Sequence, residues 1–346
     1  MSAPIILVGG GLATGTAVRE LRDQGYAGDL VVIAGEAHAP YERPPLSKGY
    51  LLGNEPAEKA FVNDKAWYAE HDIDLRTLDD STALKAQLTA GARIGIIGGG
   101  WIGLEVASAA QQAGAEVVVL EALEQPLLNV VGPEVGALFA QLHREKGVDV
   151  RTGVRVEEIT AGSDGATIGL AGGDTIPVDR LVVGVGVLPV ADLAAGAGIA
   201  VDNGILVDAG LRTSAPGVFA AGDVANVDHP TLGHRLRVEH WDTAIKHGTV
   251  AATNLLGGQA LADQLPYFFT DQYALGLEYV GHPGPDGFDR VVVTGDTDGP
   301  VEGRTFRVWW LRGDRVVAGM HVNDWDAIGR VRELVGTDAD EAALRS

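Results

Sequence analysis

The order of apolar and polar residues repeats one pattern at two places in the chain. A short, continuously apolar run at 5–8 leads into glycines and then into apolar residues at helical spacing. The same order recurs from Ile94 through Gly98 to Ala110, and another apolar run follows at 117–120. A continuous apolar run that ends in glycines before a helix is typical of a buried parallel strand. The pattern therefore predicts two βαβ units of the dinucleotide-binding kind.

The pattern after the second unit first completes an α/β domain and then changes in character. The elements expected there are a helix at 134–146, strands at 148–159, 166–170, 174–177 and 181–185, short strands over 205–222 and a helix at 239–256. From Pro266 onward, runs of strand length alternate with turns, which is typical of antiparallel sheet. The elements expected in this part are strands at 272–280, 290–295, 304–311 and 315–322, a hairpin turn at Gly313–Asp314 and a last helix at about 325–335. We therefore expect a separate C-terminal α+β domain.

The second unit carries the motif Gly98-x-Gly100-x-x-Gly103 between its first strand and its helix. Glycine permits the tight turn there and lets backbone N–H groups at the helix N-terminus approach a pyrophosphate. Glu121 ends the next strand, near the spacing of about 20 residues at which an acid holds the ribose 2′-hydroxyl. A carboxylate there would repel a 2′-phosphate, so NAD(H) is favoured over NADP(H). Trp101 lies inside the loop, and we expect its ring to cover the nicotinamide pocket and not to fill a core.

The first unit is less regular than the second. Gly9 and Gly11 are present, but Thr14 occupies the third position of the motif, which puts close packing of helix on strand in doubt. Glu36 ends the second strand of this unit and is its candidate ribose-binding acid. Further along, the segment before Asp223 is expected to be a strand, and an acid at the carboxyl end of a strand can accept a hydrogen bond from a polyol hydroxyl.

Composition narrows the chemistry that the chain can perform. There are no cysteines, which excludes disulfides, thiolate metal sites and redox-active dithiols, so redox chemistry requires a bound cofactor. The formal net charge is −21 and no run of Lys or Arg occurs, which disfavours nucleic acid and anionic membranes as partners. The histidines are scattered without carboxylates at ligand spacing, so no metal site is expected. No apolar stretch has the length of a membrane span, and we expect a cytoplasmic protein.

Four segments of the sequence, taken together, are specific enough to indicate a protein family. They are Pro40–Lys48 (PYERPPLSK), Gly98–Glu105 (GGGWIGLE), Ala220–Asp223 (AAGD) and Pro266–Gln272 (PYFFTDQ). Together they resemble the flavin-dependent NADH:ferredoxin reductases, a family that includes putidaredoxin and rubredoxin reductases and serves haem monooxygenases and ring-hydroxylating dioxygenases. The resemblance covers nearly the whole chain. It implies an α/β fold with two Rossmann-like domains of the glutathione-reductase type and a C-terminal α+β domain.

The resemblance also implies roles for individual residues. FAD would be held by Gly9, Gly11, Glu36, Arg43, Pro44, Lys48 and Asp223, and NADH by Gly98, Gly100, Gly103 and Glu121. Lys48 and Glu105 would meet near the flavin as the catalytic ion pair and place positive charge beside N5, unless they form only a surface pair. Trp241 resembles a family aromatic beside the flavin, but Trp241 and Ile245 could equally be the apolar face of a helix.

One departure from the family pattern lies in the first FAD-binding segment. Family members carry a small β-meander and a strand ending in Ala-Thr-Gly before the NADH domain, and this chain lacks both. Only residues 37–92 separate Glu36 from Arg93, and they contain one strand-like piece, Ile73–Arg76. We interpret the junction as an internal deletion. Backbone groups beside the first strand would then be unpaired unless the strand at 218–222 moves over to pair with it.

These observations lead to one main interpretation and two alternatives. The main one is an FAD-dependent oxidoreductase that passes electrons from NADH to a ferredoxin-type carrier. A rubredoxin as acceptor is the first alternative, and an NAD-binding protein that has lost flavin binding is the second. The expected domains are a shortened FAD domain (1–91 and 206–262), an NADH domain (92–205) and a C-terminal domain (265–346). Because ferredoxins are usually acidic, docking would require a local basic patch near the flavin.

Overall fold

The structure is a computed structural model that describes residues 4–35, 40–56, 59 and 79–345. The first predicted unit is present as β1 (Ile5–Val8), α1 (Leu12–Asp23) and β2 (Leu30–Ile33), and the two strands pair in parallel. Their sheet has only these two strands among the described residues. Alternate residues of both strands pack toward α1, whereas Ile6 and Val8 on the opposite face are 57% and 60% exposed. This face of the sheet is therefore largely open to solvent.

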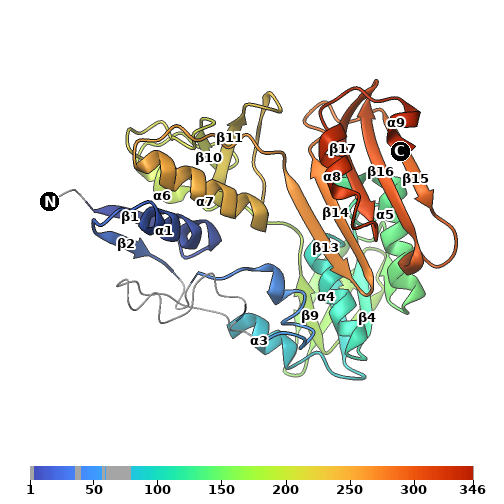
Figure 1. The fold of residues 1–346 in the computed structure, drawn as a ribbon. Coiled ribbons are helices and arrows are strands. Elements are labelled where there is room, and N and C mark those ends of the chain that lie inside the picture. Colours follow the sequence, from blue (N-terminus) through green and yellow to red (C-terminus); the bar gives the residue numbers. More distant parts are fainter. Residues whose placement is uncertain (1–3, 36–39, 57–58, 60–78, 346) are drawn as a thin grey trace.

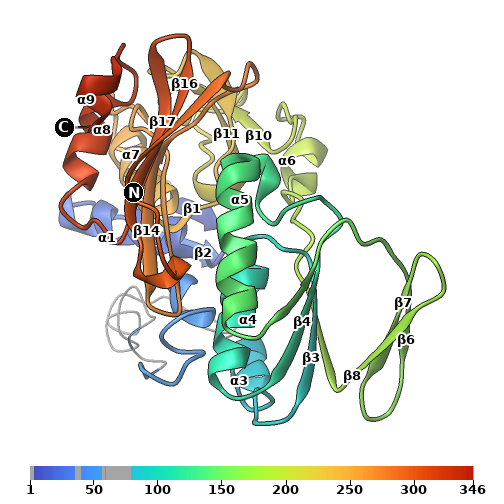
Figure 2. The ribbon, with the colours of Figure 1, turned by 90° about the vertical axis from the view of Figure 1, so that its right-hand side faces the viewer.

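The second predicted unit forms a complete parallel sheet. Its strands, in the spatial order β5-β4-β3-β9, are β5 (Asp149–Arg151), β4 (Glu116–Leu120), β3 (Arg93–Ile97) and β9 (Arg180–Val183). Helices α4 (Trp101–Gln112) and α5 (Leu128–Glu145) pack on it through the largest hydrophobic core of the molecule. Helix α5 starts earlier than predicted because a first turn precedes a kink at Gly132, whose φ is 80°. A small antiparallel sheet of β6 (Val156–Ala161), β7 (Ala166–Leu170) and β8 (Thr175–Val178) extends away from α4 and α5 (Figure 2).

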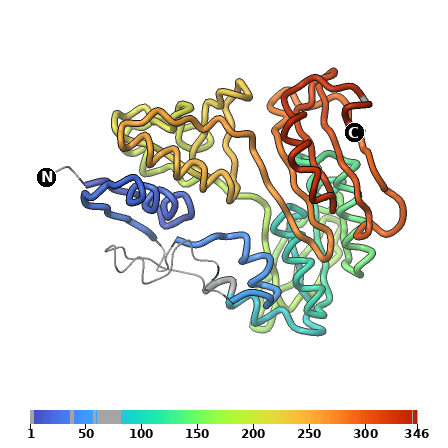
Figure 3. Tube along the Cα trace, viewed as in Figure 1, coloured from blue at the N-terminus to red at the C-terminus, as the bar shows by residue number. Residues whose placement is uncertain are grey.

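A three-stranded sheet, the β10–β12 sheet, follows the second unit along the chain and precedes the C-terminal part. It contains β10 (Ile205–Val207), β11 (Ala225–His229) and β12 (His234–Leu236), with α6 (Asp192–Gly196) before it and α7 (Trp241–Leu255) after it. Helix α7 runs beside α1, as the trace in Figure 3 shows. The two helices approach closely at Gly248, where an added Cβ would lie 2.7 Å from the carbonyl oxygen of Ala13.

The predicted strand at 218–222 is wrong. Its only pairing is an isolated bridge between Phe219 and Arg212, and a 3₁₀ helix, η3 (Gly222–Val224), follows it. It does not move over to extend the sheet of β1, which pairs only with β2 among the described residues. Its backbone groups are instead satisfied by the segment 211–213, because Thr213 donates to Val218 and Ala220 donates to Leu211.

The C-terminal part is a five-stranded antiparallel sheet in the order β13-β14-β17-β16-β15. Its elements are β13 (Tyr267–Gln272), β14 (Leu275–Gly281), β15 (Arg290–Asp296), η4 (Val301–Gly303), β16 (Thr305–Arg312), β17 (Arg315–Val322), α8 (Ile328–Leu334) and α9 (Glu341–Arg345). The turn at Gly313–Asp314 is confirmed, whereas the single strand predicted at 272–280 is divided by a hairpin at Tyr273–Ala274. One face of the sheet packs on α4 and α5 (Figure 1), and the buried indole of Trp310 donates to the carbonyl of Val131.

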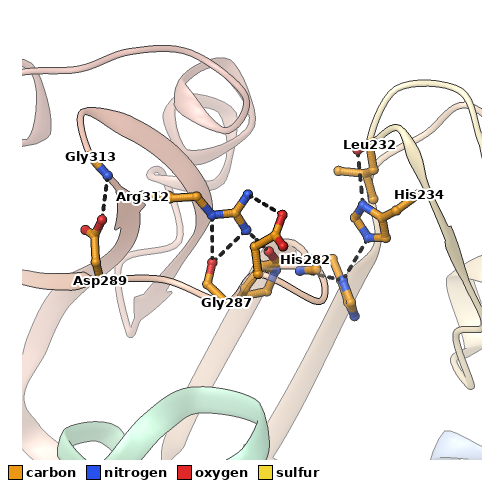
Figure 4. A network of polar contacts seen from close by, with 10 residues as sticks. Leu232, His234, His282, Gly287, Asp289, Arg312 and Gly313 are labelled. Atoms are coloured by element: carbon orange, nitrogen blue, oxygen red, sulfur yellow. Dashed lines mark hydrogen bonds and ion pairs between the residues drawn. The ribbon is translucent and has the colours of Figure 1, made fainter.

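Polar contacts join the C-terminal sheet to the β10–β12 sheet (Figure 4). Arg312, at the end of β16, donates to the carbonyl oxygens of Pro283 and Gly287 and so holds the loop after β14. In that loop, Nδ1 of His282 lies 3.4 Å from Nε2 of His234 on β12. In the described part of the chain there are also two short helices, η1 (Pro44–Leu46) and α3 (Asp79–Lys85). Among the residues described, no helix combines the length and apolar character needed to cross a bilayer.

Candidate functional site

The second glycine loop is built so closely that two of its glycines have no room for a side chain. Gly98 has a φ of 105°, and a Cβ on it would lie 2.2 Å from the carbonyl oxygen of Gly184. A Cβ on Gly103 would lie 2.1 Å from the carbonyl oxygen of Gly98. Gly100, the N-cap of α4, has no heavy atom within 4 Å of the corresponding position. The space over Gly100 at the helix N-terminus is the kind of cradle that a diphosphate occupies.

Glu121 lies at the edge of this cradle, directly after β4. Its carboxylate accepts hydrogen bonds from the backbone N–H of Gly99 at 2.6 Å and of Leu123 at 2.8 Å. These two bonds hold the acid beside the glycine loop, at the carboxyl end of a parallel strand. That is the place where an acid meets a ribose in dinucleotide-binding folds.

The first glycine loop has similar backbone geometry. Gly9 has a φ of 115°, and Gly11 is the N-cap of α1 with no heavy atom within 4 Å of a Cβ position. Thr14 in the third motif position does not prevent α1 from forming on the strands. Glu36 lies outside the described residues.

The loop that carries Asp223 comes close to this first cradle. A Cβ on Gly222 would lie 3.0 Å from the side chain of Ala13 at the start of α1. Burial raises the pKa of Asp223, and Glu239 raises it further, whereas the positive charges of Arg43 and Arg237 oppose the shift. Arg43, from the segment before η1, is therefore close enough to Asp223, from a distant loop, for their charges to interact. Pro44 is the first residue of η1.

His247 on α7 supports the Asp223 loop, because its Nδ1 accepts the backbone N–H of Gly222 at 3.2 Å. Burial, with a further contribution from His229, lowers the pKa of His247 from 6.5 to about 4. The unfolded chain therefore binds a proton that the folded chain excludes between these values, and stability falls as the pH drops through this range. At pH 5 the loss from this residue is about 2 kcal/mol.

We expect His247→Asn to reduce this acid sensitivity, because asparagine keeps an acceptor for Gly222 but does not titrate. The measurement is the unfolding free energy or midpoint at pH 7 and pH 5 for both proteins. The wild-type protein should lose about 2 kcal/mol more than the variant over that interval. An equal loss in the two proteins would show that His247 is not excluded from protonation in the folded state.

A buried ion pair lies where the η1 segment, α4 and β13 meet. Nζ of Lys48 is 2.5 Å from Oε1 of Glu105, whose side chain is only 5% exposed. Ser47 donates to the other carboxylate oxygen at 2.5 Å, and the hydroxyl of Thr270 donates to Oε1 at 2.6 Å. The ammonium of Lys48 also lies 5.1 Å from the ring centre of Phe269. The interpretation of Lys48 and Glu105 as an exposed surface pair is therefore wrong, because both are largely buried and are held by further hydrogen bonds.

The two predicted tryptophans differ in their surroundings. The ring of Trp101 packs against Phe139 and Phe268, with ring centres at 5.5 and 4.7 Å, at the border of the main core. The ring therefore packs against the edge of this core and stays partly exposed, and its predicted place over the nicotinamide pocket remains a prediction. Trp241, the first residue of α7, meets Phe269 edge-on at 6.2 Å.

Sequence reasoning missed three residues connected to the buried pair. Thr270 contacts Glu105 directly, and Gln272 and His143 continue the hydrogen bonding behind it. The available signal was the alternation in β13, in which two buried polar side chains two positions apart share a face with Phe268. Buried polar groups without an obvious partner indicate a network, but the sequence does not show where the partner lies.

Comparison with known proteins places this arrangement among flavin and pyridine-nucleotide enzymes. Residues 61–248 match the family described as pyridine nucleotide-disulphide oxidoreductase, and residues 267–345 match the family described as reductase C-terminal. The ferredoxin–NAD(+) reductase component of the anthranilate 1,2-dioxygenase system of Burkholderia cepacia is 36% identical, with 98% of this chain and 96% of the relative covered. Putidaredoxin reductase of Pseudomonas putida is 31% identical, with 92% and 88% covered.

Solved structures agree with these relatives. The putidaredoxin reductase in its covalent complex with putidaredoxin superposes with a TM-score of 0.89 at 29% identity, covering 98% of this chain and 96% of that chain. The ferredoxin reductase for the CYP199A2 system of Rhodopseudomonas palustris also gives 0.89 at 29% identity, covering 99% and 98%. The predicted resemblance and the predicted fold class are confirmed.

The comparison also bears on the predicted deletion. The alignment with the Burkholderia protein spans 394 positions, whereas this chain has 346 residues. At least 48 positions of that relative, the difference between these numbers, therefore have no counterpart here. The two-stranded first sheet agrees with a loss in the first FAD-binding segment.

The open cradles over Gly11 and Gly100, with Asp223 near the first and Glu121 at the edge of the second, fit two dinucleotides. The absence of cysteine removes the dithiol chemistry in the family's description and leaves flavin and nicotinamide. Together with the match over more than half of the residues, these features show that the chain belongs to the pyridine nucleotide-disulphide oxidoreductase family, whose members use FAD and NAD(H).

Proposed function

We propose that this protein is an FAD-dependent NADH:ferredoxin oxidoreductase that supplies electrons to a haem monooxygenase or a ring-hydroxylating dioxygenase. The observation that carries the proposal is the buried pair of Lys48 and Glu105, which joins the segment after the first cradle to the helix of the second. The named relatives are reductase components of dioxygenase and cytochrome systems, which supports the same assignment. A cytoplasmic location is part of the proposal, because NADH is available there.

The cofactor assignments follow from the two cradles. We propose that FAD binds to the domain formed by 1–91 and 206–262, and NADH to the domain formed by 92–205, with 265–346 as the C-terminal domain. The proposed FAD contacts are Gly9, Gly11, Glu36, Arg43, Pro44, Lys48, Asp223 and Trp241, and the proposed NADH contacts are Gly98, Gly100, Trp101, Gly103 and Glu121. The close backbone approach at both glycine loops and the convergence of Arg43 and Asp223 support this division.

Bound FAD accepts a pair of electrons from nicotinamide as hydride and can pass them on singly to a one-electron carrier. The role of Lys48 is to present a fixed positive charge that favours the reduced, anionic cofactor. Glu105 holds that charge in place, and the ring of Phe269 limits access of water to it. Because the chain has no cysteine, no protein dithiol can relay the electrons. Transfer to the acceptor would therefore be direct.

The first test is the purified protein itself. We expect a yellow protein with a flavin spectrum that bleaches on anaerobic addition of NADH and recovers when an oxidised ferredoxin is added. Recovery with rubredoxin but not with ferredoxin would favour the rubredoxin alternative.

A colourless protein that binds NADH would instead support the NAD-binding alternative. The two-stranded first sheet with its exposed face is the observation that keeps this second candidate in view. To exclude simple loss of cofactor during purification, the colourless protein would be incubated with FAD, and the quenching of FAD fluorescence would be measured.

A further inference from the structure

A continuous line of hydrogen bonds runs from Glu105 on α4 to His143 on α5 and ends at the half-buried Tyr273. Thr270 contacts Glu105 at 2.6 Å, and Nε2 of Gln272 lies 3.3 Å from Oγ1 of Thr270. Oε1 of Gln272 is 2.8 Å from Nε2 of His143, and the hydroxyl of Tyr273 is 3.3 Å from Nδ1 of the same ring. Gln272 and His143 are fully buried. The line therefore connects α4, β13 and α5 in the interior of the molecule.

The charge of Glu105 sets the direction of every bond in this line. An ionised carboxylate only accepts, so the hydroxyl of Thr270 must donate to it and keeps only acceptor capacity for Gln272. The amide of Gln272 then donates to Thr270 and turns its carbonyl to His143, which fixes the protonated ring nitrogen as Nε2. The free Nδ1 accepts the hydroxyl proton of Tyr273. All four donors point toward Glu105, and the histidine is neutral.

The neutral form of His143 agrees with this direction, and the backbone of Tyr273 agrees with its place at the end of the line. Burial lowers the pKa of His143 to about 4, so its ring carries no charge near neutral pH. Tyr273 has a φ of 58°, a left-handed conformation that is unfavourable for a bulky residue outside glycine-type turns. Its backbone N–H donates to Ser108 on α4 at 3.0 Å. Strain of this kind persists where the surrounding contacts impose it, and here they place the ring of Tyr273 against His143.

We propose that Thr270, Gln272 and His143 are positioning residues that hold Glu105, and through it Lys48, in the geometry required for hydride transfer from NADH. The proposal rests on the proposed function as an FAD-dependent reductase. A carboxylate with its partners in place cannot rotate away from Lys48, so the positive charge stays at one distance from the reacting atoms. Small displacements of a reacting group lower rates steeply, so the effect should be visible in the hydride-transfer step and not in NADH affinity.

The decisive pair of variants is Gln272→Leu and Gln272→Glu. Leucine breaks the line at all pH values, and we expect flavin reduction by NADH to slow about tenfold, with NADH affinity unchanged and a more negative flavin midpoint potential. Protonated glutamic acid reproduces the pattern of the amide, with a hydroxyl donor toward Thr270 and a carbonyl toward His143, whereas ionised glutamate has no donor. Among the described residues, the other titratable or charged groups that face this line are Glu105, Lys48 and Asp271 at one end. At the other end they are His143, Tyr273, Lys146 and Glu302.

We therefore expect the Gln272→Glu rate to approach that of the wild type at low pH and to fall as the new carboxyl ionises. Gln112→Leu is the matched control, because this amide contacts Ser108 beside the line but is not part of it. Its rate, potential and pH profile should equal those of the wild type. A Gln272→Leu protein with wild-type rate and potential, or a Gln272→Glu protein with the wild-type pH profile, would overturn the proposal.

A measurement without turnover separates this inference from the proposed function. In protein labelled with ¹⁵N-histidine, the signals of His143, assigned from their loss in His143→Asn, should report the Nε2–H tautomer at pH 7. An Nδ1–H tautomer contradicts the hydrogen-bond direction whether or not flavin is bound. If the wild type is not reduced by NADH at all, the proposed function fails, while the tautomer still decides the direction of the line.

Discussion

Replacing Gly103 with alanine is expected to destabilise the NADH-binding unit and to abolish NADH binding. The added Cβ would lie 2.1 Å from the carbonyl oxygen of Gly98, a backbone atom whose own residue is confined by Gly184. Helix α4 must move away from β3 to relieve this contact, which costs about 3 kcal/mol and separates the helix N-terminus from the glycine loop. Thermal unfolding and calorimetric titration with NADH measure the two effects.

Gly100→Ala is the matched control for this prediction. No heavy atom lies within 4 Å of its Cβ position and its φ is −77°, so stability should change by less than about 1 kcal/mol. The methyl group would nevertheless point into the space proposed for the pyrophosphate, and the Kd for NADH should rise at least about tenfold. Unchanged NADH affinity in Gly100→Ala would show that the dinucleotide does not lie over this helix N-terminus, and unchanged stability in Gly103→Ala would contradict the packing described here.

Replacing Lys48 with methionine is expected to slow the reduction of bound flavin by NADH about a hundredfold. Methionine keeps the length and apolar stem of lysine but removes the charge that lies 2.5 Å from Glu105. The carboxylate would then have no cation beside it, and negative charge developing on the cofactor would be opposed and no longer stabilised. Stopped-flow absorbance at several NADH concentrations separates the limiting rate from the Kd, which should change less than about threefold.

Lys85→Met serves as the control for the loss of a lysine in the same region. Lys85 lies 4.5 Å from the ring centre of Tyr50 and does not contact Glu105 in the described structure. Its limiting rate should equal that of the wild type. Equal limiting rates for Lys48→Met and the wild type would remove Lys48 from the mechanism.

Much of the fold could be predicted because its signals are local. The glycines at 9 and 98 adopt positive φ values that other residues rarely tolerate, so the sequence at those positions reports the backbone directly. The hairpin at Gly313–Asp314 is equally local, and Gly313 has a φ of 59°. By contrast, the turn at Tyr273–Ala274 contains no glycine, so its sequence does not distinguish it from the strand predicted at 272–280.

The sequence by itself determined the two glycine-loop motifs and the absence of dithiol chemistry, because each depends on a short motif or on composition, and it predicted the deletion in the first FAD-binding segment. Only the tertiary structure decided that residues 218–222 do not join the sheet of β1 and that Trp101 packs against the edge of a core. It also decided that Thr270, Gln272 and His143 lie behind Glu105. The physical reason is distance along the chain. His143 and Gln272 are 129 positions apart, and no local preference reports a hydrogen bond that only the packing of α5 on the C-terminal sheet creates.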